Sequence, residues 1–438
     1  MTNSNAADLE AEYERRTPTS KEHFEEARTY LPGGDTREVT YVDPYPTFVE
    51  EASGCTLTTA DGEELLDFLN NYTQSVLGHA PPTVVDAVTE RFARGNGLAA
   101  PTTEATELAR RIVERVPSVE TVRFANSGTE ATMNAIRAAI AHTGNEHVLK
   151  LDGAFHGTHD TVLVGVEDEG RENPGVPTTV EERVSTVPFN DTKALVEAFE
   201  RHGDDLACFI VDPIMGNAGM IPPREGFLET ARDLTADTDT LLLFDEVMTF
   251  RMDPGGAQER YGIRPDLTAF GKFIGGGLPA GAFGGREDVM SVFDPATGSV
   301  THSGTFNANP ATMVGGAATL DALDGNAIER LNDLGATARE RLEAVCADAE
   351  VPAQVTGDAS FLNVHFTDDE VRDARTGTTH EAITERFSLA MRNRGVFVAD
   401  RGLVNLSTPM GEPEIDALVD AVEGALADLS TAAAFDGA

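Results

Sequence analysis

The segment Leu241-Leu-Leu-Phe-Asp-Glu246 runs four apolar residues directly into two acids. A short apolar run between polar turns is typical of a buried strand in a parallel sheet. The same pattern occurs upstream at 147–151 and 206–211. Stretches with helical apolar spacing alternate with these runs, at 84–94, 104–116 and 128–142. This alternation predicts an α/β domain with a largely parallel sheet.

The pattern changes twice along the chain, which predicts three parts. Residues 1–74 combine a charged helical arm with short strands and a hairpin turn at Asp61-Gly62. Residues 75–310 form the large α/β domain, and helices dominate again in 311–438, where the last helix is expected at 412–429. We expect the first and third parts to build one smaller α+β domain.

The chain is strongly acidic, with a formal net charge of −41 from 74 acidic and 33 basic residues. This charge argues against binding to nucleic acid or to an anionic membrane surface. The acids are spread along the chain rather than gathered in a tail. A surface adapted to high salt, where counter-ions screen the repulsion, therefore explains them better than an acidic partner-binding segment. The sequence predicts a halophilic protein.

Hydrophobic residues make up 40% of the chain, yet no apolar run approaches the roughly 20 residues that span a bilayer. The first 16 residues have neither the basic nor the apolar region of a signal peptide. We therefore expect a soluble cytoplasmic protein. The cysteines, at positions 55, 208 and 346, are far apart, which predicts free thiols and no metal site.

The acids that end the first segment lie where an open α/β sheet gathers functional groups, at the carboxyl ends of its strands. A carboxylate buried there is costly unless it has a partner. A protonated pyridine nitrogen would suit Asp245 as that partner. The alternative is that Asp245 caps a following helix.

The segment Phe124-Ala-Asn-Ser-Gly-Thr-Glu-Ala131 has the form of a strand end, a turn and the start of a long helix. Ser127, Gly128 and Thr129 would then direct backbone N–H groups and hydroxyls to one point at a helix N-terminus, which suits a phosphate. The alternative is ordinary helix capping by Ser127 or Thr129.

Lysine is scarce: the chain has only Lys21, Lys150, Lys193 and Lys272. Lys272 lies in 269–277, between apolar residues and a run of glycines. Desolvation lowers the pKa of a lysine and frees its amine, and glycines let a planar ligand approach closely. The glycines follow the lysine, so the stretch is not a P-loop. The alternative is a surface lysine whose stem lies along apolar residues.

Taken together, these motifs identify a resemblance. The chain resembles the class III aminotransferases, which are fold type I pyridoxal-phosphate (PLP) enzymes, in the branch of the glutamate-1-semialdehyde 2,1-aminomutases. The resemblance runs from about Leu31 to Pro409. It implies an α/β fold with a large, mainly parallel-sheet domain, a smaller α+β domain, and PLP as cofactor. Its most specific pieces are residues 126–131, 244–249, 255–258, 265–267, 271–279 and 304–310.

The resemblance also implies roles for single residues. Lys272 would bind the cofactor as a Schiff base and move the proton, Asp245 would pair with the ring nitrogen, and Val247 would pack on the ring. Thr305 would reach the phosphate of a partner subunit, which implies a homodimer with its site at the interface. The remaining phosphate ligands would be Ser127, Gly128 and Thr129.

Four further positions match the family less completely. Phe155 and His156 fall on a Tyr-His-Gly motif, with Phe in place of Tyr, so stacking survives and a phenolic hydroxyl is lost. By itself, Phe155 could equally be an ordinary core residue. Asn217 matches a position near the 3-hydroxyl of the cofactor. Asp212 stands where the family often has Glu.

Substrate choice is expected in 31–39 and 41–46. After Gly33-Gly34 the chain has Asp-Thr-Arg, where semialdehyde aminomutases usually carry Ser-Pro-Val-Arg. This looks more like the β-amino-acid aminotransferases, such as the β-phenylalanine type, whose carboxylate-binding arginines fall on Arg37 and Arg401. The planar fork of arginine suits a carboxylate. The alternative for either residue is a surface ion pair.

The favoured function is therefore amino transfer between a carboxylate-bearing amino acid, with a β-amino acid preferred, and a keto acid. The main alternative is a glutamate-1-semialdehyde 2,1-aminomutase, which moves the amino group within one molecule to give 5-aminolevulinate. A sugar aminotransferase or a PLP-binding protein without catalysis also stays open. The paired arginines argue against the former, and the full set of cofactor residues argues against the latter.

Overall fold

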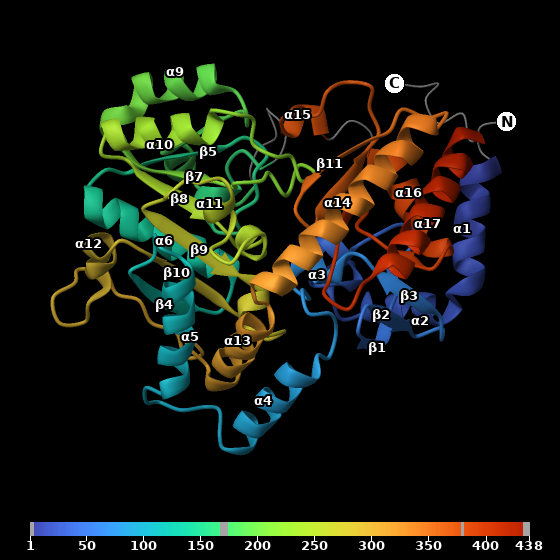
Figure 1. The fold of residues 1–438 in the computed structure, drawn as a ribbon, viewed down its shortest axis with the longest axis horizontal. Helices are drawn as coiled ribbons and strands as arrows, with labels where there is room; N and C mark the ends of the chain where they lie inside the picture. Colours follow the sequence, from blue (N-terminus) through green and yellow to red (C-terminus); the bar gives the residue numbers. More distant parts are fainter. Residues whose placement is uncertain (1–3, 167–173, 378–380, 432–438) are drawn as a thin grey trace.

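The computed structural model describes residues 4–166, 174–377 and 381–431. Its larger half is built on a seven-stranded sheet, with strand order β4-β10-β9-β8-β7-β5-β6 (Figure 1). Only β10 pairs in the antiparallel sense, with both of its neighbours. The structure thus confirms the largely parallel sheet that the sequence predicts. Its strands are β4(Thr121–Ala125), β5(His147–Leu151), β6(Val184–Val187), β7(Leu206–Val211), β8(Leu241–Asp245), β9(Leu267–Gly271) and β10(Gly281–Gly285).

Both faces of this sheet are covered by helices, which explains the continuous apolar runs of its strands. In β8, Leu241 and Leu243 pack with α6 on one face, while Leu242 and Phe244 pack with α9 and α10 on the other. Parallel strands covered on both faces have no solvent side, so alternation of polar and apolar residues disappears. The covering helices are α6(Gly128–Thr143), α9(Thr192–His202), α10(Phe227–Asp237) and α12(Glu287–Met290).

A group of helices extends from the β4 edge of the sheet, where α13 contacts both α4 and α5 (Figure 1). These are α4(Pro82–Ala93), α5(Thr103–Arg115) and α13(Pro310–Ala322). The first two were expected from their apolar spacing, and each starts within two residues of the predicted position.

The other half joins both ends of the described chain. Its four-stranded sheet has the order β1-β2-β3-β13, so the N-terminal strand β3 pairs in parallel with the C-terminal β13. The predicted hairpin is present, because β2 and β3 are antiparallel on either side of Asp61-Gly62. A three-stranded sheet, β11-β12-β14, lies beside it. The strands are β1(Val49–Ser53), β2(Thr56–Thr59), β3(Glu64–Asp67), β11(Gln354–Asp358), β12(Phe361–His365), β13(Val396–Phe397) and β14(Leu403–Asn405).

Long helices pack on these two sheets, and Figure 1 shows α1 of the N-terminal segment beside α16 and α17 of the C-terminal segment. The helices of this half are α1(Ser4–Arg16), α2(Pro18–Ala27), α14(Gly325–Asp348), α16(Glu381–Asn393) and α17(Glu412–Thr431). Within the described ranges, none of the helices is long and apolar enough to cross a membrane. The short helices are α3(Asn70–Thr73), α7(Asp160–Leu163), α8(Thr178–Glu181), α11(Ala257–Arg260) and α15(Ala374–Gly377).

One predicted strand ends early for a clear reason. The segment Leu65–Leu69, apolar except at Asp67, suggests a strand to residue 69, yet β3 stops at Asp67. The carboxylate of Asp67 accepts hydrogen bonds from the backbone N–H groups of Leu69 and Asn70, at 2.9 and 2.8 Å. This side chain therefore turns the backbone out of the sheet, as Asp commonly does in turns.

Candidate active site

The site forms where two neighbouring parallel strands end. Asp245 is the last residue of β8 and is paired with Ala269 of β9, and Lys272 follows directly after β9. Carboxyl ends of parallel strands meet at one edge of a sheet, which brings the acid and the amine together. Lys272 itself has a positive φ of 53°, unusual for a residue with a side chain.

The amine of Lys272 is shifted toward its neutral form. Burial lowers the pKa of Lys272 to about 8, although the carboxylates of Asp245 and Asp212 oppose this shift. The positive charges of Arg401 and Arg37 act in the same direction as burial. A neutral amine is the nucleophilic form, so Lys272 is prepared to attack a carbonyl.

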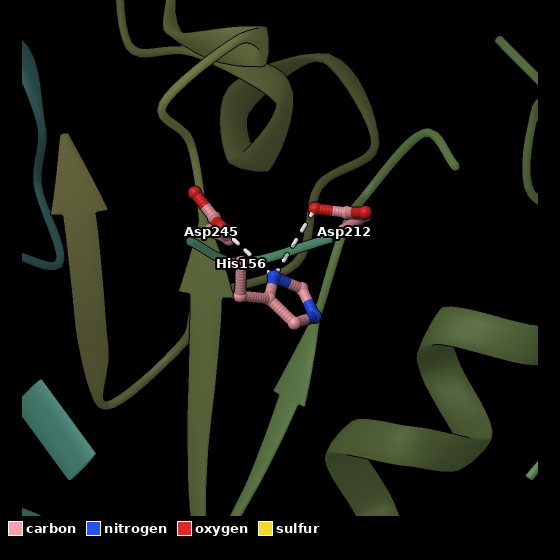
Figure 2. Close-up of side chains that lie close together, drawn as sticks. All are labelled: His156, Asp212 and Asp245. Carbon is pink, nitrogen blue, oxygen red and sulfur yellow. Dashed lines mark hydrogen bonds and ion pairs between the residues drawn. The ribbon is translucent and has the colours of Figure 1, made fainter. Parts of the chain in front are cut away.

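Two carboxylates converge on one imidazole beside the lysine, as Figure 2 shows for His156, Asp212 and Asp245. The Nδ1 atom of His156 lies 2.8 Å from Oδ2 of Asp245 and 3.5 Å from Oδ1 of Asp212. Asp245 also accepts the N–H of Val247 at 3.0 Å. Burial raises the pKa of Asp212 to about 7. Together these contacts fix Asp245 at the strand end.

The turn after β4 leads directly into the N-terminus of α6, where an anion-binding cradle was expected. Ser127 is the N-cap of α6, and its Oγ accepts the N–H of Glu130 at 3.1 Å. The two earlier N–H groups of this turn, those of Gly128 and Thr129, have no intrahelical acceptor and can bind a ligand. A Cβ on Gly128 would lie 3.2 Å from both methyl carbons of Val247, and one on Gly271 would lie 3.4 Å from Gly128 Cα. The cradle therefore lies directly beside the lysine-bearing strand end.

These groups fit PLP. A phosphate needs a helix N-terminus, a pyridine nitrogen needs a buried carboxylate, and an aldehyde needs a neutral amine. The cradle at 127–129, Asp245 and Lys272 supply one of each at a single sheet edge. A Cβ at either glycine would crowd Val247, at 3.2 Å from Gly128 and 3.1 Å from Gly271, so glycine lets these backbone segments pack closely against that side chain.

Three other predicted residues are Phe155, Asn217 and Thr305. The side chain of Phe155 is 44% exposed, so it is not a core residue and is free to stack on a ligand. Asn217 donates to the carbonyl of Gly153 at 3.3 Å and accepts a hydrogen bond from Nη1 of Arg401. The exposed Thr305 lies in a segment joined to the cradle, because Asn307 accepts a hydrogen bond from Asn126 at 2.8 Å.

The two predicted substrate arginines meet at one aromatic ring. The guanidinium carbons of Arg37 and Arg401 each lie 5.6 Å from the ring centroid of Tyr72, so they can be at most twice that distance apart. Within the described residues, neither arginine forms an ion pair with a carboxylate. The Nε of Arg401 is buried without a hydrogen-bond partner, and burial lowers the pKa of Arg401. Two such cations call for anionic ligands.

A turn that the sequence did not predict carries this ring. All four residues of α3, Asn70, Asn71, Tyr72 and Thr73, have positive φ values, from 48° to 76°, so this short helix is left-handed. Such backbone costs roughly 1–2 kcal/mol per residue for most side chains and less for Asn. Asn71 Oδ1 accepts a hydrogen bond from Arg37 at 2.8 Å. The paired asparagines were the available signal, because Asn tolerates this conformation best.

Comparison with known proteins identifies the family of the chain. The family model for aminotransferase class-III matches residues 39–425. The glutamate-1-semialdehyde 2,1-aminomutase of Methanothermobacter thermautotrophicus is 42% identical, over 94% of this chain and 99% of its own length.

Solved structures give the same picture. An omega-transaminase from Sphaerobacter thermophilus is 42% identical with a TM-score of 0.90, covering 93% of this chain and 97% of its own. A beta-phenylalanine aminotransferase from Variovorax paradoxus is 36% identical with a TM-score of 0.91, covering 99% of both chains. The predicted family, fold class and cofactor are thus confirmed. The chain belongs to the aminotransferase class-III family and is a PLP-dependent enzyme.

Proposed function

We propose that this enzyme transfers an amino group between a carboxylate-bearing amino acid, with a β-amino acid preferred, and a keto acid. The observation that carries the proposal is the pair of arginines, Arg37 and Arg401, which contact the same ring of Tyr72 and whose positive charges both lower the pKa of Lys272. Both cations lack a carboxylate partner among the described residues. A pair of sites for carboxylates suits an enzyme that receives an amino donor and then a keto-acid acceptor.

We also propose cofactor-binding roles, which the geometry of the sheet edge supports. When bound, PLP supplies a carbonyl that condenses with amines and a ring that withdraws electrons from the reacting carbon. Asp245 keeps a proton on the ring nitrogen, and His156 and the N–H of Val247 hold Asp245 in place. Lys272 binds the cofactor and then carries the proton at its Nζ. The other cofactor contacts proposed are Ser127, Gly128, Thr129, Phe155, His156, Asn217, Val247 and Thr305.

The second candidate is a glutamate-1-semialdehyde 2,1-aminomutase, favoured by curated relatives of that name such as the one from Methanothermobacter thermautotrophicus. Its substrate has one carboxylate, so one arginine would suffice. The deciding assay offers the pure enzyme glutamate-1-semialdehyde alone, and separately β-phenylalanine with 2-oxoglutarate. Our proposal expects glutamate to form in the second mixture. Formation of 5-aminolevulinate in the first, without an acceptor, would overturn it.

We further propose a cytoplasmic homodimer. Phe306, 65% exposed, follows the also exposed Thr305, and a second subunit would cover both. In that dimer Thr305 reaches the phosphate held by the partner's cradle. For the domains, we propose the boundaries 1–74, 75–310 and 311–438, which the shared β3–β13 pairing supports. Sedimentation tests the dimer: a monomer that turns over normally would contradict it.

A further inference from the structure

Arg251 is an unusual cation, far from solvent and without a counter-charge. It lies after β8 in a short 3-10 turn, and its side chain is fully buried. Among the described residues, no carboxylate pairs with it. Burial lowers the pKa of Arg251 to about 9. Burying a guanidinium without a counter-charge lowers the stability of the folded state. Apolar side chains of similar size often replace even buried ion pairs without loss of stability. Packing alone therefore does not account for it.

Its hydrogen bonds join three distant parts of the chain. Nη1 donates to the carbonyl of Thr73 at 3.4 Å and to Oδ1 of Asn405 at 3.5 Å. Nη2 donates to Oγ of Ser360 at 3.2 Å and to the carbonyl of Leu406. The guanidinium thus links the β8 strand end with the C-terminal half and with the last residue of the left-handed turn α3.

The same network holds the other end of that turn. The amide of Asn70 donates to the carbonyl of Asn405 at 2.8 Å, and the amide of Asn405 donates to the carbonyl of Leu69 at 2.7 Å. A run of left-handed residues is strained, and strained backbone persists where its surroundings over-determine it. Here Asn405 binds the start of the turn while Arg251 binds its end.

The middle of the turn contacts the arginines assigned to the substrate. Asn71 accepts a hydrogen bond from Arg37, and the ring of Tyr72 lies beside both Arg37 and Arg401. The hydroxyl of Tyr72 donates to the carbonyl of Val39, close to Arg37 in the chain. A shift of the turn would therefore move both guanidinium groups.

We propose that Arg251 is a positioning residue for substrate recognition: it fixes the left-handed turn 70–73, which in turn orients Arg37 and Arg401 toward a substrate carboxylate. This inference rests on the proposed function. Arg251 touches neither the cradle nor Lys272 in the described contacts, so its effect is expected on carboxylate binding and not on the amine chemistry.

The test compares two donors that differ in one group. The holoenzyme and its Arg251→Met variant are mixed with β-phenylalanine or with 1-phenylethylamine, which lacks the carboxylate, and the change in cofactor absorbance gives kcat/KM for each. The Met variant should lose about ten- to hundredfold with β-phenylalanine, the range for one hydrogen bond to a charged group. With 1-phenylethylamine, the kcat/KM of the Met variant should stay near the wild-type value. Arg251→Lys, which keeps the charge, should lose less.

Arg115→Met is the matched control, because Arg115 also donates to backbone carbonyls, those of Leu320 and Leu323, away from the turn. Arg115→Met should leave the ratio of the kcat/KM values for the two donors unchanged. Equal losses on both donors in Arg251→Met would mean a merely structural role and would overturn the inference. Arg37→Ala separates the two proposals. If it leaves the preference for β-phenylalanine intact, the proposed function fails; if it removes the preference and Arg251→Met does not, only the inference fails.

If Arg251→Met does not fold, the exposed Asn71 offers a second route. Asn71→Gly and Asn71→Ala both remove the hydrogen bond to Arg37, but only glycine adopts the left-handed conformation freely. With β-phenylalanine, the Ala variant should have the lower kcat/KM. Equal values would show that the turn does not orient the arginines and would overturn the inference.

Discussion

The Nδ1 atom of His156 donates a hydrogen bond to Oδ2 of Asp245 at 2.8 Å, and both side chains are buried. Because a carboxylate only accepts, this contact places the imidazole proton on Nδ1. The Nε2 of His156 has no hydrogen-bond partner among the described residues. The histidine therefore acts on the site through Asp245, by holding this side chain in place at the strand end.

Loss of this hydrogen bond should weaken the cofactor site. His156→Leu should lower cofactor affinity and turnover by about 10- to 100-fold, as expected for one hydrogen bond to a buried charge. His156→Asn can place an amide N–H near the same oxygen and should lose less. Titration of the apoprotein with PLP, followed by visible absorbance, measures this. His142→Asn, on the outer end of α6, is the control. Equal affinities for the Leu variant and wild type would contradict the role.

Lys150 should make stability depend on pH. Its side chain is 0% exposed, and burial lowers the pKa of Lys150 to about 8 from 10.5. Between those values the unfolded chain binds the extra proton, so this group's contribution to stability rises with pH. Lys150→Met removes the titration. The difference in unfolding free energy between variant and wild type should change by at most about 3 kcal/mol from pH 7 to 10.5.

Urea unfolding of the apoprotein at several pH values measures that difference. Lys193→Met is a suitable control, because the side chain of Lys193 is 86% exposed beside Glu197. The difference in unfolding free energy between Lys193→Met and wild type should hardly vary with pH. A constant difference for Lys150→Met would mean that the amine is not desolvated.

Close packing of Val247 on two glycines predicts a coupled pair of substitutions. Gly128→Ala would place a Cβ 3.2 Å from both methyl carbons of Val247 and should cost the apoprotein about 1–3 kcal/mol. In a Val247→Ala background the same change should cost less, because the colliding methyl groups are gone. Denaturant unfolding of the four proteins in a double-mutant cycle gives the coupling. If the losses in unfolding free energy from the two single substitutions simply add in the double variant, the side chains at positions 128 and 247 do not contact each other.

Dependence on salt tests the halophilic prediction. The net charge of −41 implies strong self-repulsion, which is screened as the Debye length falls from about 10 Å at 0.1 M to about 3 Å at 1 M. The midpoint of thermal unfolding should rise with KCl through the molar range. Sorbitol at matched osmolality should raise it less. If the midpoint does not change with KCl, the halophilic interpretation is wrong. The acidic residues would then be an ordinary solvated surface.

Many of the strands and turns that position this site could be predicted, because they depend on the pattern of apolar and polar residues within a short segment. Apolar runs identified β5, β7 and β8, and the residues at their ends, such as Asp245, follow from sheet geometry. Ser127 could be placed because its capping role depends on the three residues after it.

Other parts depend on contacts that no local pattern carries. His156 meets Asp245 across 89 residues, and Tyr72 contacts both Arg37 and Arg401 only after three distant segments fold together. The left-handed turn is strained locally, so propensity argues against it. Only tertiary contacts such as those of Arg251 with Thr73 and Leu406 make it favourable.

We expect Lys272, and no other lysine of the chain, to bind the cofactor covalently. Its sharpest rival is Lys150, the other lysine whose pKa burial lowers to about 8. The deciding measurement is borohydride reduction of the holoenzyme followed by peptide mass mapping. We predict a phosphopyridoxyl mass on the peptide that contains Lys272 and none in Lys272→Ala. An adduct on Lys150, or one that survives in Lys272→Ala, would contradict the account.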